Sequence, residues 1–509
     1  MKRLLGGNMN NIISLQHIIN GEKTIGNAIT VFDIYNPATG KIIRQMQGAN
    51  ADDVNAAVSV AKHAFSAWSQ VTPSHRAQIM FNYRELVIKN LDELARMVCE
   101  EHGKTLADAK GEVMRGVEVI EFCTAINSHL KSDFSANVSE GIDSYNMRQP
   151  LGVCAGITPF NFPAMVPMWM YPVAIACGNT FVLKLSEKDP SCGLRLTELM
   201  IEAGLPKGVL NTLVGDKEAV DAILHHPDIS SISFVGSTAV GEYIYHEGSL
   251  HNKRVQALCG AKNHMIVMPD ASMDQACDAI IGAAYGSAGE RCMAVAVVVT
   301  IGDETADRLI KQLKPMVKNL HIGHYDEQGV EMGPVISQQS QDKILSYIQQ
   351  GEQQGAELTI DGRGETQREG YFIGGCVFDK VTPDMSIYRE EIFGPVLSIV
   401  RVDSYNEALT LVNEHEYGNG ATVFTRDGDT ARHFTMNVQV GMAGVNVPIP
   451  VPVAMHSFGG WKRSLFGTTA IHGMEGIRFY TRLKTVTTRW PSGIRKGAQF
   501  HFESGKDAS

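Results

Sequence analysis

The sequence places one of its nine cysteines, Cys292, in a setting suited to nucleophilic chemistry. The segment "SAGERCMAVAVVV" puts it between a Gly-containing loop and an apolar run that predicts a buried strand. The adjacent Arg291 can stabilise a thiolate or an anionic substrate, and the other cysteines have no such setting. Because most cysteines beside apolar runs are inert core residues, this segment alone leaves both interpretations open.

Two further segments place polar residues directly after apolar runs. In "FVGSTAVG" a strand is expected to end at Val235 and a helix to open at Ser237, so that amides near Gly236 could hold a pyrophosphate. The spacing is not GxGxxG, and an ordinary capped turn is the alternative. The segment "TFVLKLSE" ends in Lys184 and Glu187. Either these two side chains are solvated or they bind an adenosine ribose. In the second case the glutamate favours NAD over NADP, because its charge repels a 2′-phosphate.

Two turns add polar and aromatic candidates. The segment "TPFNFP" holds Asn161 between Phe160 and a second phenylalanine, in a turn made rigid by prolines, where its amide could donate to a developing oxyanion. The segment "EEIFGPV" presents Glu391 and Phe393 before a Gly-Pro turn. Taken singly, each also fits a simple surface turn.

The elements that must position these residues follow from hydrophobic periodicity. Residues 51–122 show apolar residues at helical spacing, and from Leu151 short apolar runs alternate with helical stretches, which indicates parallel βαβ units. We therefore predict an α/β fold with two doubly wound open-sheet lobes, the first of Rossmann type, and a small oligomerisation β element. The predicted ranges are 10–126 and 148–257 for the first lobe, 258–472 for the second lobe, and 127–147 with 473–495 for the oligomerisation element.

Composition narrows the class of protein. The 509 residues carry a formal net charge of -10 with no basic block, which argues against nucleic acid and acidic membranes as partners and favours small molecules. An odd number of cysteines without a CxxC pair indicates reduced thiols and predicts no metal site. No apolar run is long enough for a membrane span or a secretion signal, so we expect a cytoplasmic protein.

Together and in this order, the five segments resemble the aldehyde dehydrogenase superfamily from about Gln16 to Trp490. The resemblance implies that Cys292 is the nucleophile and that Asn161, with the amide of Cys292, forms the oxyanion hole. It implies that the first lobe is the NAD-binding domain and the second the catalytic domain, with NAD as cofactor and a homotetramer as the assembly. The NAD-binding residues that it implies are Phe160, Lys184, Glu187, Gly236, Ser237, Glu391 and Phe393, of which Glu391 binds the nicotinamide ribose.

One departure from the superfamily pattern bears on the reaction. Hydrolytic members carry "ELGGK", whose glutamate activates water, whereas this chain reads "LCGAK" with Leu258 in that place. Because leucine accepts no proton, hydrolysis of an acyl-enzyme loses the ~10²- to 10⁴-fold help of a general base. Coenzyme A, whose thiol is a better nucleophile than unassisted water, is therefore the expected acyl acceptor.

The strings "ALCGAKNH", "GERCMA", "NVPIPVPV" and "HGMEGIRFYTRLKTVTTRW" are similar to those of the methylmalonate-semialdehyde dehydrogenases, a coenzyme A-acylating branch. The resemblance implies oxidation and decarboxylation of malonate or methylmalonate semialdehyde to acetyl-CoA or propionyl-CoA, and it leaves open whether valine, β-alanine or inositol breakdown is served. A substrate carboxylate needs a cation near the nucleophile, and this branch suggests Arg291 and Arg115. A lone helical arginine such as Arg115 is otherwise an ordinary solvated residue.

Two alternatives remain at this stage. A hydrolytic aldehyde dehydrogenase could borrow another base, and Glu290, two residues before Cys292, is the candidate. A non-catalytic structural or binding protein with the same fold is the other alternative. Retention of Cys292, Asn161, Lys184 and Glu391 together argues against the latter.

Overall fold

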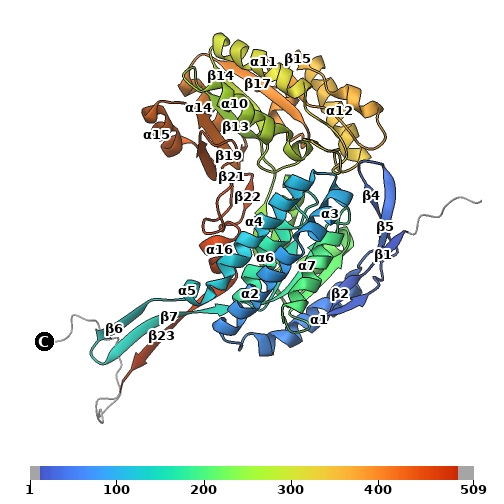
Figure 1. Cartoon of the computed structure of the whole chain (residues 1–509). Helices are drawn as coiled ribbons and strands as arrows, with labels where there is room; N and C mark the ends of the chain where they lie inside the picture. Colours follow the sequence, from blue (N-terminus) through green and yellow to red (C-terminus); the bar gives the residue numbers. More distant parts are fainter. Residues whose placement is uncertain (1–11, 491–509) are drawn as a thin grey trace, which may run out of the picture.

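The computed structural model describes residues 12–490, so the predicted range ends at residues 10–11 and 491–495 lie outside the described residues. Figure 1 shows two lobes, one above the other, and a narrow β arm that extends from the lower lobe. The prediction of two doubly wound lobes with a small β element is confirmed. The exact domain ranges stay a prediction.

The lower lobe is built on an eight-stranded sheet of order β22-β12-β11-β8-β9-β10-β2-β3. Its strands are β2 (His17–Ile19), β3 (Glu22–Thr24), β8 (Val153–Ile157), β9 (Thr180–Leu185), β10 (Leu210–Val214), β11 (Ile229–Val235), β12 (Arg254–Leu258) and β22 (Leu465–Phe466). The five strands from β12 to β10 run parallel. The chain passes from β8 outward through β9 to β10 and returns to the other side of β8 with β11, so the strand order reverses between β8 and β11. Ligands bind open parallel sheets at the carboxyl ends beside such a reversal.

Helices cover both faces of this sheet. One face carries α1 (Ala51–Trp68), α8 (Lys217–His225) and α9 (Thr238–Leu250), and the other carries α6 (Met165–Ala176) and α7 (Ser191–Glu202), backed by α2 (Pro73–Lys89), α3 (Leu91–His102), α4 (Leu106–Thr124) and α5 (Ile126–His129). Alternate side chains of β8 enter different cores, because Val153 and Ala155 join the cluster that holds α1 whereas Cys154 joins the cluster that holds α6. Apolar β8 is therefore buried on both sides, as a central parallel strand must be.

The upper lobe contains a seven-stranded sheet of order β15-β16-β17-β14-β13-β19-β20. Its strands are β13 (Asn263–Val267), β14 (Val295–Ile301), β15 (Glu357–Ile360), β16 (Cys376–Asp379), β17 (Val396–Val402), β19 (Gly420–Phe424) and β20 (Met442–Val445). Its helices are α10 (Met273–Ile280), α11 (Asp303–Lys318), α12 (Gln338–Gln353), α13 (Ser386–Arg389), α14 (Tyr405–Glu414) and α15 (Gly428–Asn437). The β-branched residues of β14 and β17 lie in one continuous core with these helices.

The arm is an antiparallel sheet of β6 (Phe134–Ser139), β7 (Ile142–Pro150) and β23 (Thr481–Arg489), and β23 follows α16 (Gly473–Phe479). Figure 1 shows it projecting away from both lobes. Phe134, Val138 and Leu483 are exposed on it, which suits a surface that pairs with another subunit. None of the described helices is long and apolar enough to cross a bilayer.

Three small features were not predicted. β1 (Ile13–Leu15), β4 (Val31–Asn36) and β5 (Lys41–Gln47) form a separate three-stranded sheet. In addition, β22, from the range predicted as catalytic, crosses to the lower lobe and pairs with β12, and β18 (Tyr417–Gly418) pairs with β21 (Trp461–Lys462). The pairing of β22 with β12 ties the two lobes together at the edge of the lower sheet, on the β11 side of the strand-order reversal.

Candidate active site

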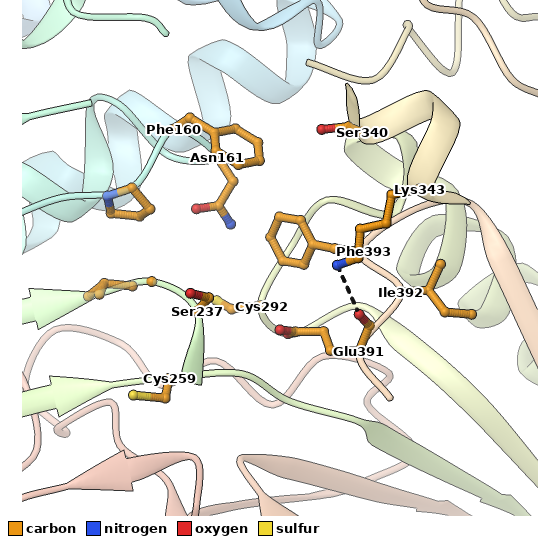
Figure 2. A pocket seen from close by; sticks show the side chains of 13 residues that line it. Phe160, Asn161, Ser237, Cys259, Cys292, Ser340, Lys343, Glu391, Ile392 and Phe393 are labelled. Atoms are coloured by element: carbon orange, nitrogen blue, oxygen red, sulfur yellow. Dashed lines mark hydrogen bonds between the residues drawn. The ribbon is translucent and has the colours of Figure 1, made fainter. Parts of the chain in front are cut away.

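A hollow of about 210 Å³ lies at the carboxyl ends of β8 and β11, between the two lobes. Its lining consists of Pro159, Phe160, Asn161, Val235, Gly236, Ser237, Cys259, Cys292, Ser340, Lys343, Glu391, Ile392 and Phe393. Figure 2 shows Phe160 and Asn161 from the lower lobe above Cys292 and facing Phe393 from the upper lobe, with Glu391 beside Cys292. The predicted nucleophile, the predicted amide donor and five of the predicted cofactor residues therefore share one site.

Cys292 follows a strained turn that leads into β14. Ser287 and Ala288 have φ of 51° each, a conformation that costs a non-glycine residue roughly 1–2 kcal/mol. Gly289 has φ of 73°, and a Cβ there would lie 2.3 Å from the carbonyl oxygen of Gly394. The loop that carries Cys292 thus lies directly against the loop that carries Glu391 and Phe393. Strain of this kind persists only where surrounding contacts hold the loop in place.

The environment of Cys292 keeps its thiol neutral in this state. Burial raises its pKa to about 12, and the negative charge of Glu391 acts in the same direction. The backbone N–H groups of Cys292 and Met293, together with Arg291, act in the opposite direction but are outweighed. Formation of the reactive thiolate therefore requires a change around the sulfur, such as the arrival of substrate or of a positively charged ring.

Asn161 is held from both sides. Its side-chain Nδ2 donates to the backbone carbonyl of Glu290 at 2.9 Å, and its own backbone carbonyl accepts from Lys104 Nζ at 2.8 Å. Lys104 forms a fully buried ion pair with Glu112 at 2.7 Å, and Glu112 also accepts from the backbone N–H of Ala164 before α6. The amide is thus fixed beside the Cys292 loop, in a position to donate to an oxygen that develops negative charge there.

The edge of the sheet beside Asn161 fits a dinucleotide. Ser237, the N-cap residue of α9, makes no side-chain capping hydrogen bond, so the first turn of this helix presents backbone amides that Ser237 does not satisfy. Two strands further along the edge, Lys184 lies near the end of β9 and Glu187 follows the strand, with Nζ and Oε2 3.6 Å apart. Burial lowers the pKa of Lys184. Neither Lys184 nor Glu187 lines the hollow itself, and they lie along the same edge with β8 between them and α9.

Glu391 and Phe393 close the hollow from the upper lobe. The Glu391 carboxylate accepts from the backbone N–H of Ala261 at 2.9 Å, and burial raises its pKa. Lys343 Nζ donates to the Glu391 backbone carbonyl at 3.5 Å, the dashed line of Figure 2. Phe393 has φ of 62°, and its ring meets Phe160 edge-on with centroids 5.9 Å apart. A pair of aromatic rings, one from each lobe, is suited to enclose a flat ring.

The two predicted carboxylate binders lie outside this hollow. Arg291 pairs with Asp108 and donates to Ser287 Oγ at 3.4 Å, and it lines a separate hollow of about 20 Å³ that reaches Cys292 from behind. Arg115 pairs with Glu118 at 2.7 Å and also donates to the backbone carbonyl of Pro452. Each arginine therefore already has an acidic partner, which a substrate carboxylate would have to share or displace.

The structure also places the two residues on which hydrolysis depends. Leu258 ends β12, is 3% exposed and lies opposite Val235, which lines the hollow. The Glu290 carboxylate is buried away from the hollow and accepts from the backbone N–H of Ile336 at 3.2 Å. Burial raises the pKa of Glu290 to about 8, but this carboxyl group faces the Ile336 amide outside the hollow, so it is not placed to take a proton from water at Cys292. Among the described residues, Glu391 is the one carboxylate that lines the hollow.

Several contributors were not found from the sequence. Lys104, Glu112 and Asp108 belong to a helical stretch that carries no motif, and they reach the site only because α4 packs against α6 and the Cys292 loop. Ser340 and Lys343 enter from α12 at the end of a polar stretch. Polar residues spaced along a helix gave no signal that separates them from a solvated face.

Comparisons with known proteins identify the family of this chain. Residues 25–486 match the model of the aldehyde dehydrogenase family, and the chain belongs to this family. It is 54% identical over 495 residues to a malonate-semialdehyde dehydrogenase of Pseudomonas aeruginosa, which covers 96% of this chain and 99% of that protein.

Two solved structures share both fold and sequence with this chain. The structure of a putative methylmalonate-semialdehyde dehydrogenase from Sinorhizobium meliloti, complexed with NAD, is 54% identical with a TM-score of 0.93 and covers 95% of this chain and 99% of that chain. The methylmalonate-semialdehyde dehydrogenase of Oceanimonas doudoroffii is 51% identical with the same TM-score and the same coverage.

Proposed function

We propose that this chain oxidises malonate semialdehyde or methylmalonate semialdehyde with NAD and transfers the acyl group from Cys292 to coenzyme A. The observation that carries the transfer to a thiol is Leu258, an aliphatic residue at the strand end where hydrolysis needs a carboxylate. The names of the relatives support the choice of substrate. The cytoplasm as location and a homotetramer assembled through the β arm belong to the same proposal.

The residues of the hollow act on the aldehyde in a defined order. The Cys292 thiolate, once its proton has passed to solvent, attacks the carbonyl carbon, while Asn161 Nδ2 and the Cys292 backbone N–H stabilise the oxygen that becomes negative. In the structure Nδ2 is engaged by the Glu290 carbonyl at 2.9 Å, so a second acceptor would share this donor group. NAD, when bound, accepts the hydride that leaves the tetrahedral carbon, and a thioester on Cys292 remains.

The chain's residues fit NAD along the edge of the lower sheet. The uncapped first turn of α9, with Gly236 and Ser237, is suited to the pyrophosphate, and Lys184 with Glu187 to the adenosine ribose. A carboxylate at Glu187 repels a 2′-phosphate, which favours NAD over NADP. Glu391 is suited to the second ribose, and the rings of Phe160 and Phe393 limit where the nicotinamide can lie.

The carboxylate of the substrate allows the thioester to lose carbon dioxide before the acyl group is transferred. Because it lies β to the thioester carbonyl, the bond to this carboxyl group can break with release of carbon dioxide, and the electron pair is delocalised as an enolate that is then protonated. Arg291 and Arg115 are the cations that would orient this carboxylate before it leaves. Attack by the coenzyme A thiol then expels Cys292 and yields acetyl-CoA or propionyl-CoA.

The direct test supplies purified protein with NAD and each semialdehyde, with and without coenzyme A, and follows NADH together with products by mass spectrometry. We expect sustained NADH formation and an acyl-CoA product only when coenzyme A is present. Free acid made at full speed without coenzyme A would establish hydrolysis instead. Activity that is unchanged after selective alkylation of Cys292 would contradict a catalytic role for this residue, whereas no NADH formation with either semialdehyde would favour a non-catalytic protein.

A further inference from the structure

Three potential metal ligands converge on the lower lobe, away from the hollow. They are His225 at the end of α8, Glu247 in the last turn of α9, and His251 directly after α9. One ligand atom from each lies within 4.8 Å of the others, and His225 Nε2 is 3.7 Å from Glu247 Oε2. We propose that these three side chains form a binding site for a divalent transition-metal ion, with Zn²⁺ as the preferred ion.

The backbone presents this set without rearrangement. Glu247 and His251 are four residues apart, so they lie on one face of the same helix, one turn from each other. The backbone N–H of His251 donates to the Glu247 carbonyl at 3.2 Å, which continues the helical hydrogen bonding to the third ligand. α8 packs against α9, and the imidazole rings of His225 and His251 have centroids 4.6 Å apart. All three residues are therefore anchored on packed helices instead of on a free loop.

The ligand chemistry selects the ion. Two imidazoles and one carboxylate suit Zn²⁺ and its neighbours in the transition series, whereas Mg²⁺ and Ca²⁺ prefer oxygen ligands. Zinc-to-ligand distances of about 2.0–2.1 Å place tetrahedral ligand atoms roughly 3.3 Å apart, so the side chains must close by at most about 1.5 Å. The side chain of His225 is 48% exposed and therefore free to rotate, and solvent can supply the fourth ligand.

Neighbouring charges set the expected strength. Arg254 and Arg482 line the open hollow that also contains His225 and His251, and their positive charge opposes a cation. Arg254 is held away by hydrogen bonds to the backbone carbonyls of Phe479 and Thr481 at 2.6 and 2.8 Å. The exposed position and the nearby arginines make this a site of moderate affinity, one that fills and empties with the metal supply.

A metal ion at this site would crosslink the ends of two helices. A bound ion would join the end of α8 to the end of α9, whose opposite end carries Ser237 at the hollow, about 20 Å away at 1.5 Å per residue. Because the ion binds the folded chain, it should raise the thermal unfolding temperature in proportion to its occupancy. In the sequence, His225 stands alone and Glu247 and His251 are four residues apart. This pattern is too common to indicate a metal site by itself.

The test is a calorimetric titration of metal-free, full-length protein with ZnCl₂, after alkylation of Cys292 so that its thiol cannot bind zinc. We expect about one Zn²⁺ per chain, a rise in unfolding temperature and no saturable binding of MgCl₂. The variants His225→Ala and His251→Ala should each weaken zinc binding by at least about tenfold and lose the thermal shift. His246→Ala is the matched control, because His246 is exposed on the same helix and contacts the other Glu247 oxygen at 3.3 Å.

Each outcome decides the proposal. If the variants and the unsubstituted chain unfold at the same temperature in the presence of a chelator, the helices still form in the variants. A loss of zinc binding is then caused by the loss of the ligand side chain. Three results overturn the proposal. Zinc binding could survive both His225→Ala and His251→Ala, it could be lost equally in His246→Ala, or it could be absent in the unsubstituted chain at millimolar zinc. These readouts do not depend on catalysis, so they stand or fall separately from the proposed function.

Discussion

Lys104 Nζ lies 2.8 Å from the backbone carbonyl oxygen of Asn161. The Lys104 side chain has no exposed surface, and Glu112, also buried, is its ion-pair partner. Glu112 in turn accepts from the backbone N–H of Ala164, on the far side of the same turn. The buried pair therefore grips the Asn161 turn at two points and sets the direction in which its amide points. Lys104 touches neither the hollow nor Cys292, so it acts by positioning.

Replacing Lys104 tests this role. Lys104→Met leaves Glu112 buried without its partner, which should cost about 3–5 kcal/mol of stability, and it frees the Asn161 carbonyl. We expect kcat to fall about 10- to 100-fold with little change in NAD affinity, because the α9 terminus is a separate contact. Steady-state kinetics, NAD binding and thermal unfolding measure the three quantities.

A double variant separates positioning from stability. Lys104→Met combined with Glu112→Gln removes the stranded charge, so most of the unfolding free energy should return while kcat stays low. A kcat that recovers together with stability would show that Lys104 serves the fold alone.

The electrostatics of Cys292 predict how its reactivity depends on pH. Its pKa is raised to about 12 by burial and by the charge of Glu391, so the neutral thiol is favoured, and the thiolate fraction rises about tenfold per pH unit up to that value. In the absence of ligands, alkylation of Cys292 by iodoacetamide should therefore accelerate from pH 7 to pH 10 without the plateau that an ordinary thiol shows near pH 9. Peptide mass spectrometry follows the modification at this residue.

Glu391→Gln should shift that alkylation profile to lower pH, because it removes the negative charge that opposes the thiolate. Glu290→Gln is the control, since the Glu290 carboxylate is turned toward Ile336 and is not among the causes of the Cys292 shift. Identical profiles for the Glu391 variant and the unsubstituted chain would contradict this account.

The contact between the Cys292 loop and the Glu391 loop is tested at Gly289. An alanine there combines a positive φ with a Cβ 2.3 Å from the Gly394 carbonyl oxygen, so one of the two loops must move. We expect Gly289→Ala to lower kcat at least tenfold and to reduce stability beyond the ~1 kcal/mol that the conformation alone costs.

Gly355→Ala is the matched control for this substitution, because Gly355 has φ of 95° with nothing within 4 Å of the added Cβ. Its effect should be confined to about 1 kcal/mol in unfolding free energy, with kinetics unchanged. If the Gly289 and Gly355 variants behave alike in both measurements, close approach of the two loops has no part in catalysis.

Substrate selectivity is the place to test Arg115. If its guanidinium holds the substrate carboxylate, Arg115→Gln should raise KM for malonate semialdehyde about tenfold or more and leave KM for propanal, which lacks the carboxylate, unchanged. Arg84→Gln, which breaks a surface ion pair between α2 and Glu121 of α4, serves as control. An equal loss with both substrates would mean that Arg115 matters through its hydrogen bond to Pro452, as an anchor for that loop.

How much the sequence alone could reveal differs between the sheet and the site. Apolar runs fix β8, β9 and β11 because central parallel strands are buried on both faces, and the polar residues after them then share one edge. The strands β4 and β5 mix apolar and polar residues, most of them exposed or half-buried, and give no such pattern. The pair of Arg291 with Asp108 joins residues 183 positions apart, and the pair of Lys104 with Glu112 becomes meaningful only when α4 meets the Asn161 turn. Local patterns cannot encode such contacts, because tertiary packing creates them.

Restoring the missing carboxylate is the most direct test of why the acyl group should pass to a thiol. Leu258 ends β12 opposite Val235, at the rim of the hollow, so Leu258→Glu would place an acid where water could be activated beside the Cys292 thioester. NADH formation without coenzyme A should rise by up to about 10²-fold, with the free acid as product, and should increase further with pH because burial raises the pKa of such a carboxyl group. Leu258→Gln has the same shape without a base and should leave the coenzyme A requirement intact. If Leu258→Gln accelerates hydrolysis as much as Leu258→Glu does, the added side chain acts by admitting water and not by taking a proton. The coenzyme A requirement would then be explained by the exclusion of solvent by the leucine side chain.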